Sequence, residues 1–207
     1  MARGRDRDYF DVFVEMASVL LRAADILCLA LSGGSPAEAE KAVRRLCEAR
    51  QSAEQNKSLI RGRLYSDFIT PMERGDIFAV ANGICDAVEA ICGAFDRISL
   101  YKVTHIRRDA AAIAETLKKC CGEIYELFGN FHDFRHFERL KPHIDRITQL
   151  YRDAEKCFIR AASRLCAEAT SPLQITVWLD ILDGLRDCCS ECRSVARIVD
   201  AAVLRNT

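Results

Sequence analysis

Two carboxylates in the first half of the sequence are spaced so that they could bind a cation together. Glu54 lies 16 residues before Thr70, and Asp86 lies 16 residues after it. If one helix ends and the next begins near Thr70, both side chains lie at a similar height on neighbouring antiparallel helices, because each helical residue adds about 1.5 Å of rise. Glu89 extends the acidic surface beyond Asp86. Paired carboxylate oxygens suit a hard or borderline cation such as Mg²⁺, Ca²⁺, Mn²⁺ or iron. Solvated acids on an outer helix face are the alternative interpretation.

The second half of the sequence repeats this arrangement at an offset of 101 residues. Glu155 and Asp187 lie 16 residues before and after Ser171. The sequences TPME at 70–73 and SPLQ at 171–174 are both capping boxes with proline at the first helical position. We therefore predict that Thr70 and Ser171 each cap a helix, and that the apolar residues before Thr70 end the preceding helix. The shared offset predicts one domain, 1–207, made of two repeats, 1–105 and 106–207.

The elements that must position these carboxylates are helices. Apolar residues recur at spacings of three and four along most of the chain, and no stretch alternates like a half-buried strand. We predict an all-α fold of six long helices arranged as two tandem antiparallel three-helix bundles, because helices of this length need extended packing partners. The predicted helices cover about 8–31, 36–67 with Ser35 as its cap, a stretch after Pro71 with an apolar stripe reaching Ile98, about 103–131, from near Pro142 to 170, and 172–203.

Charge balance and cysteine content restrict the class of protein. The chain has 30 basic and 30 acidic residues, which gives no electrostatic basis for binding nucleic acid. Arg22 and Asp25 interrupt the apolar stretch near the N-terminus, so it fails as a secretory signal or membrane span. Eleven cysteines in such a chain are expected to be reduced thiols. We expect a cytoplasmic protein.

Two other groups of residues could bind zinc but are better explained otherwise. Cys188, Cys189 and Cys192 fall within about one helical turn, where core packing is the expected role. His132 and His136 have the spacing of one helix face, but they lack the glutamate of a metalloprotease signature. The sequence contains no glycine-rich phosphate loop and no nucleophile elbow.

Two segments carry a resemblance to a known family. DFITPMERGDIFAVANGICDAVEAI at 67–91 resembles the hallmark segment of PhoU-like proteins, in the branch of phosphate transport regulators that accompany the low-affinity Pit phosphate transporters. WLDILDGLRDCCSECRSVARIVDA at 178–201 is similar to the final helix of that family. The resemblance implies a cytoplasmic six-helix protein without catalysis that assists phosphate uptake. Its expected partner is an inorganic phosphate transporter or a phosphate-signalling protein, which would supply any contact with the membrane.

The resemblance also implies metal ligands, because some family members bind metal clusters through glutamate-x-x-x-aspartate motifs. The acids at or beside the motif positions in this sequence are Glu54, Asp86, Glu89, Glu155 and Asp187. Other motif positions have lost their acids and hold Arg50, Cys85, Tyr151, Arg186 and Ser190. The two arginines bring positive charge to the place of a cation, which predicts weak metal binding or none. Arg50 could instead pair with Glu54, one turn away.

Three hypotheses follow from the sequence. The first is a non-enzymatic accessory protein of phosphate uptake that docks helical surfaces onto a partner. The second is a bundle that carries a divalent, iron or zinc cation on its surface carboxylates. The third is a helical scaffold unrelated to phosphate. The first predicted helix is apolar on more than one side, which is compatible with a homodimer.

Overall fold

The computed structural model describes the backbone of residues 2–32, 36–103, 105–168 and 171–207. These residues form six long helices and one short 3-10 turn, and no strand occurs among them. The helices are α1 (Ala2–Leu31), α2 (Pro36–Ser66), α3 (Arg74–Leu100), α4 (Arg108–Asn130), α5 (Phe137–Glu168) and α6 (Pro172–Asn206), with η1 (Phe131–Asp133) after α4. The predicted all-α fold of six long helices is confirmed.

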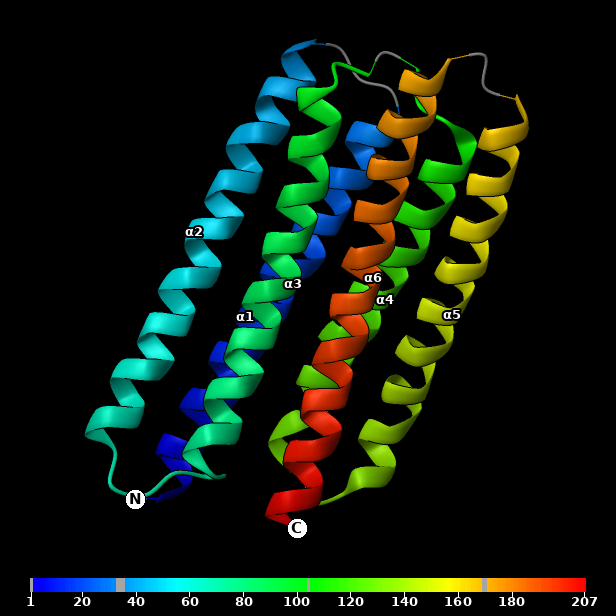
Figure 1. Ribbon diagram of the computed structural model, residues 1–207. Coiled ribbons are helices and arrows are strands. Elements are labelled where there is room, and N and C mark those ends of the chain that lie inside the picture. The colour runs from blue at the N-terminus through cyan, green and yellow to red at the C-terminus, as the bar shows by residue number, and fades with distance from the viewer. Residues whose placement is uncertain (1, 33–35, 104, 169–170) are drawn as a thin grey trace.

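The helices pack as two groups of three that meet side by side (Figure 1). Within one group α1, α2 and α3 contact one another, and within the other α4, α5 and α6 do so. Between the groups, α3 packs along α6 and α1 packs along α4, while α2 and α5 lie at the two outer sides. Gly83 permits the close approach of α3 to α6, because a Cβ there would lie 2.8 Å from Ile198 Cδ1. A two-fold relation between repeats would give this arrangement, but the repeat boundaries stay a prediction.

The predicted caps are only partly correct. α3 begins at Arg74, and the Thr70 hydroxyl donates a hydrogen bond to the Met72 carbonyl (2.7 Å) instead of capping a helix. The reason is that the chain makes an extra turn after Pro71, which buries Met72 before the helix starts. Ser171 does occupy the N-cap position of α6, but its side chain makes no capping hydrogen bond. The cap predicted at Ser35 lies outside the described residues.

Two helix starts differ from the prediction. α4 begins at Arg108 rather than near 103, because residues 105–107 before it are not helical, and Lys102 adopts a left-handed conformation (φ 48°) just after α3 ends. α5 begins at Phe137, so Pro142 lies inside the helix instead of at its first position. The helix continues through this proline because Leu140 and Ile144, on either side, are both buried in the core.

Five aromatic rings fill the core at the end of the bundle where α1 begins and α4 ends. Phe131 of η1 is fully buried, and its ring centroid lies 5.5 Å from that of Phe128 and 5.6 Å from that of Phe10. Phe13 and Phe134 complete the group, which we call the phenylalanine cluster. Edge-to-face contacts of this kind add to the free energy gained from burying the rings.

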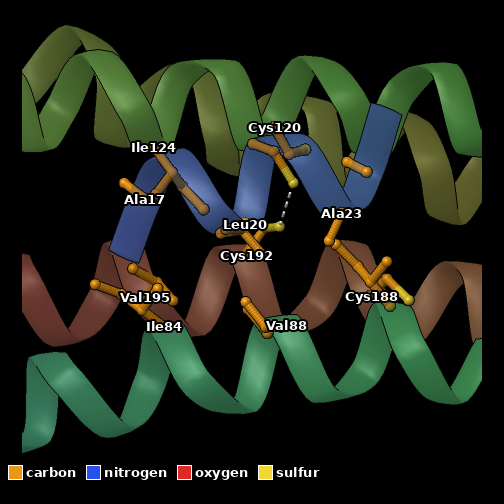
Figure 2. Packing of buried hydrophobic residues seen from close by; sticks show 14 of the residues in the cluster. Ala17, Leu20, Ala23, Ile84, Val88, Cys120, Ile124, Cys188, Cys192 and Val195 are labelled. Carbon is orange, nitrogen blue, oxygen red and sulfur yellow. Dashed lines mark hydrogen bonds between the residues drawn. The ribbon is translucent and has the colours of Figure 1, made fainter. Parts of the chain in front are cut away.

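Cysteines pack in the interior between α4 and α6. Figure 2 shows Cys192 facing α4, where its sulfur lies 3.7 Å from that of Cys121. Cys120, Cys188 and Cys189 are also fully buried beside them. Burial raises the pKa of Cys188 well above 9.0, so this thiol stays protonated at neutral pH. The predicted core-packing role of Cys188, Cys189 and Cys192 is confirmed.

Candidate functional site

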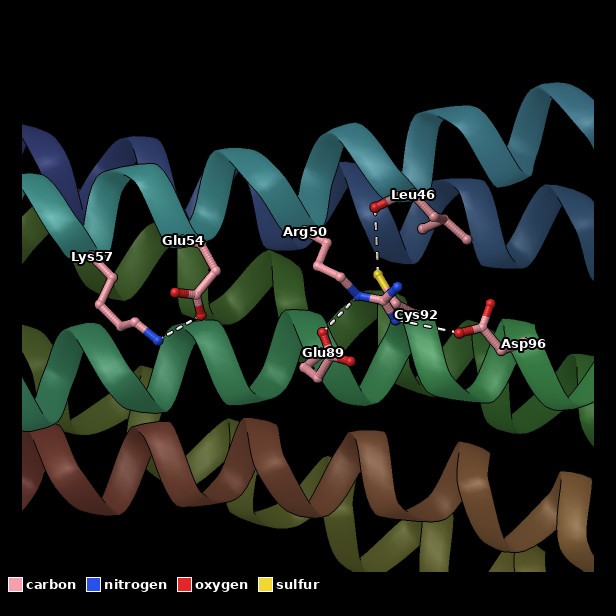
Figure 3. Close-up of polar contacts among 7 residues, drawn as sticks. All are labelled: Leu46, Arg50, Glu54, Lys57, Glu89, Cys92 and Asp96. Atoms are coloured by element: carbon pink, nitrogen blue, oxygen red, sulfur yellow. Dashed lines mark hydrogen bonds and ion pairs between the residues drawn. The ribbon is translucent and has the colours of Figure 1, made fainter.

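The predicted carboxylates of the first half lie on α2 and α3, which pack against each other, and we call the surface along this contact the α2–α3 groove. Figure 3 shows Glu54 and Glu89 there. Glu54 accepts a hydrogen bond from Lys57 Nζ (2.5 Å) on its own helix. Arg50 reaches across from α2 to α3, where it bonds Glu89 Oε2 (2.7 Å) and Asp96 Oδ2 (3.3 Å). The pair expected between Arg50 and Glu54 does not form, because Lys57 bonds Glu54 and two acids of α3 bond Arg50. Asp96 was not among the predicted residues.

Asp86 differs from its neighbours. It is exposed and makes no hydrogen bond or ion pair with any residue that the structure describes. The ammonium of Lys57 lies close enough to feel its charge, although the raised pKa of Lys57 comes mainly from the bond to Glu54. Asp86 is therefore the predicted ligand that retains the most freedom to bind an ion.

Buried thiols lie beneath the two cations of this groove. The thiol of Cys85 donates to the Ala53 carbonyl (3.2 Å), and burial raises its pKa to about 12. Cys92, beside Arg50, bonds the Leu46 carbonyl at 3.6 Å, and burial raises its pKa to about 11. A thiol must lose its proton to bind a metal. Cys85 thus places a group that stays neutral where the resemblance implies an acidic ligand.

We call the surface along the contact of α5 and α6 the α5–α6 groove. Its arginines lie against aromatic rings, whereas the cations of the first groove lie beside thiols. The Tyr151 hydroxyl donates to Glu155 Oε1 (2.5 Å), and that bond is the main cause of the raised pKa of Tyr151. Arg193 lies over the ring of Tyr151, 3.8 Å from its centroid. Arg186 lies 4.8 Å from the ring centroid of Phe158. Cation–π stacking on a partly desolvated ring is worth about 1 kcal/mol or more.

Arg186 also engages the acids around it on α6. Its Nη2 lies 2.7 Å from Asp183 Oδ1 and 2.9 Å from Asp187 Oδ1. The bond to Asp187 is the main cause of the raised pKa of Arg186. Asp187, a predicted ligand, therefore has a cation from its own helix, and Asp183 is a partner that the sequence did not indicate. Ser190 holds the third ligand place on α6 without a charge.

The side-chain pairs of the two grooves correspond at the sequence offset of 101. In each groove a basic side chain lies beside a thiol or an aromatic ring on the facing helix. The basic residues are on α2 in the first groove and on α6 in the second. The equivalent pairs are Arg50–Cys92 with Tyr151–Arg193, and Lys57–Cys85 with Phe158–Arg186. In both halves, positive charge from the chain itself occupies the groove.

The described residues do not form a ready metal centre. No group of three or more histidine, cysteine or acidic side chains among them is arranged to hold a metal ion. Glu54, Glu89 and Asp187 form ion pairs with lysine or arginine side chains, and Glu155 accepts a hydrogen bond from a tyrosine hydroxyl. These contacts argue against a resident metal at the predicted positions, and binding of a cation in solution stays a prediction.

Replacing Arg50 with alanine tests how the first groove is neutralised. We expect the free energy of unfolding to fall by no more than about 1 kcal/mol, because exposed ion pairs contribute little. Affinity for Mn²⁺ should rise, since Glu89 and Asp96 lose their shared cation. Manganese titration followed by electron paramagnetic resonance would compare the variant with wild type and with Arg61→Ala, an exposed arginine on the same helix. Equal Mn²⁺ binding in all three would show that Arg50 does not block the groove.

A second surface feature is the connection from α2 to α3. α2 ends at Ser66, so Phe68 and Ile69 lie in a loop and not at the end of a helix as predicted. Phe68 is 91% exposed and Ile69 is 70% exposed, and Tyr65, on the last turn of α2, is 85% exposed. We call these three residues the α2–α3 tip. Three large, exposed apolar side chains within five residues of sequence make this connection a candidate interaction surface.

The backbone under the α2–α3 tip is held in place. Tyr9 of α1 donates a hydrogen bond to Asp67 Oδ2 (3.1 Å), and Arg74 Nη2 donates to the Asp67 carbonyl (2.7 Å). Burial, followed by the bond to Asp67, raises the pKa of Tyr9 to about 12. Met72 anchors the other end of the loop in the core. The tip is thus presented by an anchored loop, which reduces the entropy lost on binding a partner.

One helix among the described residues has the length and composition of a membrane span. It is α3, and 61% of its most apolar window is buried inside the bundle. A helix packed at the centre of a bundle has the same composition, so this feature agrees with the position of α3 against α1, α2 and α6.

The six-helix arrangement defines the class of fold as PhoU-like. The chain is similar to a PhoU-like protein from Shewanella oneidensis MR-1, with a TM-score of 0.77 and 14% identity over 95% of this chain and 99% of that one. A second structure from the same organism, proposed to be a PhoU-like phosphate regulatory protein, gives a TM-score of 0.75 with the same coverage and identity.

Sequence comparison gives a more distant likeness. The chain is 21% identical to UPF0111 protein YkaA of Bacillus subtilis (strain 168) over 139 residues, 67% of each protein. No family model matches the chain. At these identities the comparisons establish the fold, and the α2–α3 tip and the two grooves are features of this chain's own residues.

Proposed function

We propose that this protein is a non-enzymatic PhoU-like regulator of inorganic phosphate uptake that acts by docking onto a partner. The observation that carries the proposal is the fold, which the chain shares over 95% of its length with a protein proposed to be a phosphate regulator. The partner is an inorganic phosphate transporter, of the Pit type that the resemblance implies, or a phosphate-signalling protein. The regulator is cytoplasmic and reaches the membrane through that partner.

The α2–α3 tip is the docking surface in this proposal. It exposes an aromatic, a β-branched and a phenolic side chain on an anchored loop, and aromatic residues are enriched among the anchors of protein interfaces. Non-catalytic action is supported by the state of the candidate chemical groups. The thiols of Cys85 and Cys92 are buried with raised pKa values, and most groove carboxylates are bonded to cations.

The function is tested by deleting the gene and measuring phosphate uptake and growth over a range of phosphate supply. We expect uptake to respond differently to phosphate in the deletion strain, and the wild-type gene to restore the response. Affinity purification after cross-linking should recover a phosphate transporter or a phosphate-signalling protein. Growth and uptake indifferent to phosphate would contradict the proposal and favour a scaffold unrelated to phosphate.

The docking surface is tested by the double variant Phe68→Ser, Ile69→Ser. We expect the variant to fold with unchanged stability, because both side chains are exposed, and to bind the partner at least about 10-fold more weakly, since each buried apolar anchor is worth about 1.5–3 kcal/mol. Leu59→Ser, which alters a half-exposed residue about two turns before the end of α2, is the matched control. If the double variant restores the phosphate response as well as wild type does, docking occurs elsewhere.

A further inference from the structure

The two equivalent grooves carry different charge. Eight positions can be compared between the halves: 50, 54, 57, 85, 86, 89, 92 and 96 in the first, and the positions 101 residues later in the second. In the α2–α3 groove they hold two cations and four acids: Arg50, Lys57, Glu54, Asp86, Glu89 and Asp96. In the α5–α6 groove they hold three cations and two acids: Arg186, Arg193, Arg197, Glu155 and Asp187. Asp183, the second acid bonded to Arg186, adds a third acid to the α5–α6 groove, so cations and acids balance there, whereas acids exceed cations in the α2–α3 groove.

Arg193 and Arg197 account for this difference, and neither has an acidic partner among the described residues. No hydrogen bond or ion pair joins either of them to any residue that the structure describes, whereas Arg186 bonds two acids and Arg50 bonds two acids. The two residues are four positions apart on α6, so they lie on one face one turn from each other. Like charges in that relation repel each other, and the two acids Glu155 and Asp187 are bonded to Tyr151 and Arg186 instead.

The environment of Arg193 prepares it for an anion. Its guanidinium is stacked 3.8 Å from the centroid of the Tyr151 ring, and its Nε is buried without a hydrogen-bond acceptor. Stacking already restricts the conformations of the Arg193 side chain, so binding an anion costs less conformational entropy. The planar edge of the guanidinium also matches two oxygens of an oxyanion. Glu155 is the acid that could neutralise Arg193, but the Tyr151 hydroxyl holds it at 2.5 Å.

We propose that Arg193 and Arg197 form an oxyanion-binding site on the face of α6 beside Tyr151. Arg193 supplies a fixed guanidinium edge, and Arg197, which is exposed, closes on the anion from the next turn. The choice of inorganic phosphate as the ligand rests on the proposed function, while the need for an oxyanion rests on the two unpaired arginines. The α2–α3 groove is not expected to bind an oxyanion, because Arg50 already forms ion pairs with Glu89 and Asp96. Asp96 also stands at the position equivalent to Arg197.

The site is tested by titrating the folded protein with inorganic phosphate at constant ionic strength, with chloride as the balancing anion. Binding is followed by 31P line broadening and by backbone amide shifts. We expect wild type to bind phosphate with amide shifts centred on α6, and Arg193→Gln and Arg197→Gln each to weaken binding by about 10-fold or more, the loss typical of a charge-assisted hydrogen bond. Arg50→Gln is the matched control from the equivalent groove and should bind as wild type does.

Tyr151→Phe separates this site from a general effect of positive charge. The variant keeps the ring under Arg193 and removes the hydroxyl that holds Glu155. Glu155 is then free to neutralise Arg193, so phosphate affinity should fall although no charge has been altered. Equal losses in Arg50→Gln and Arg193→Gln, or no phosphate binding by wild type, would overturn the proposal. Neither result would bear on the uptake phenotype of the deletion strain, which tests the proposed function independently.

Discussion

Replacing Phe131 with alanine should lower the free energy of unfolding by about 3–5 kcal/mol, the usual cost of removing a buried phenylalanine ring. Phe131 is fully buried and its ring contacts Phe10, Phe13, Phe128 and Phe134. The cavity would open between α1, α4 and η1, three separate elements, so no single side chain can move to fill it. Urea unfolding followed by circular dichroism would measure the change.

Two further variants make the Phe131 result specific. Phe131→Leu keeps most of the buried apolar volume and should cost clearly less than the alanine change. Tyr125→Ala alters an aromatic residue of α4 that is 37% exposed, and it should cost little by comparison. If Phe131→Ala cost no more than Tyr125→Ala, the phenylalanine cluster would not be a main source of stability at this end of the bundle.

Much of the fold could be predicted because the apolar period determines which residues form helices. The starts of three helices could not be predicted from local signals alone. Pro142 matched the first position of a helix, yet α5 begins at Phe137 because burial of Leu140 and Ile144 outweighs the hydrogen bond that a proline removes. Thr70 matched a cap, yet burial of Met72 delays α3 to Arg74. In both places tertiary packing outweighs local chemistry.

The candidate site was predictable in position but not in its partners. Equal spacing from the turn predicted that Glu54 and Asp86 lie at a similar height, and both are close enough to Lys57 to act on its charge. The partners of Arg50 lie 39 and 46 residues away on another helix, and no local pattern links them to it. The aromatic partners of Arg186 and Arg193 were also missed. The offset of 101 could have indicated them, because the rings stand at the positions equivalent to the cations of the first half, and the arginines at those equivalent to its thiols.

Asp76 joins the start of α3 to the end of α6, and no sequence pattern singled it out. Its side chain is only 6% exposed and accepts hydrogen bonds from both Nε and Nη2 of Arg205. Asn206 Nδ2 donates to Asp76 Oδ2 (2.7 Å), and Asn206 Oδ1 accepts from the backbone of Glu73 (2.8 Å). These contacts span about 130 residues of sequence, so only the folded chain brings them together.

Replacing Asp76 with asparagine should lower the free energy of unfolding at pH 7 by about 2 kcal/mol, because it weakens charge-assisted hydrogen bonds to a buried group. The bond from Arg205 is the main cause that holds the pKa of Asp76 below its ordinary value of 3.8. Because the folded pKa is the lower one, this contribution is fully present above about pH 3.8 and is lost as the pH falls through the folded value. Urea unfolding from pH 7 down to pH 2 should therefore show the gap between wild type and variant closing in acid. Asp96→Asn, at a carboxylate that is 66% exposed, should change stability by less than about 0.5 kcal/mol at pH 7. A gap that stayed constant down to pH 2 would show that the asparagine acts through packing, and that the ionised state of Asp76 does not stabilise the junction of α3 and α6.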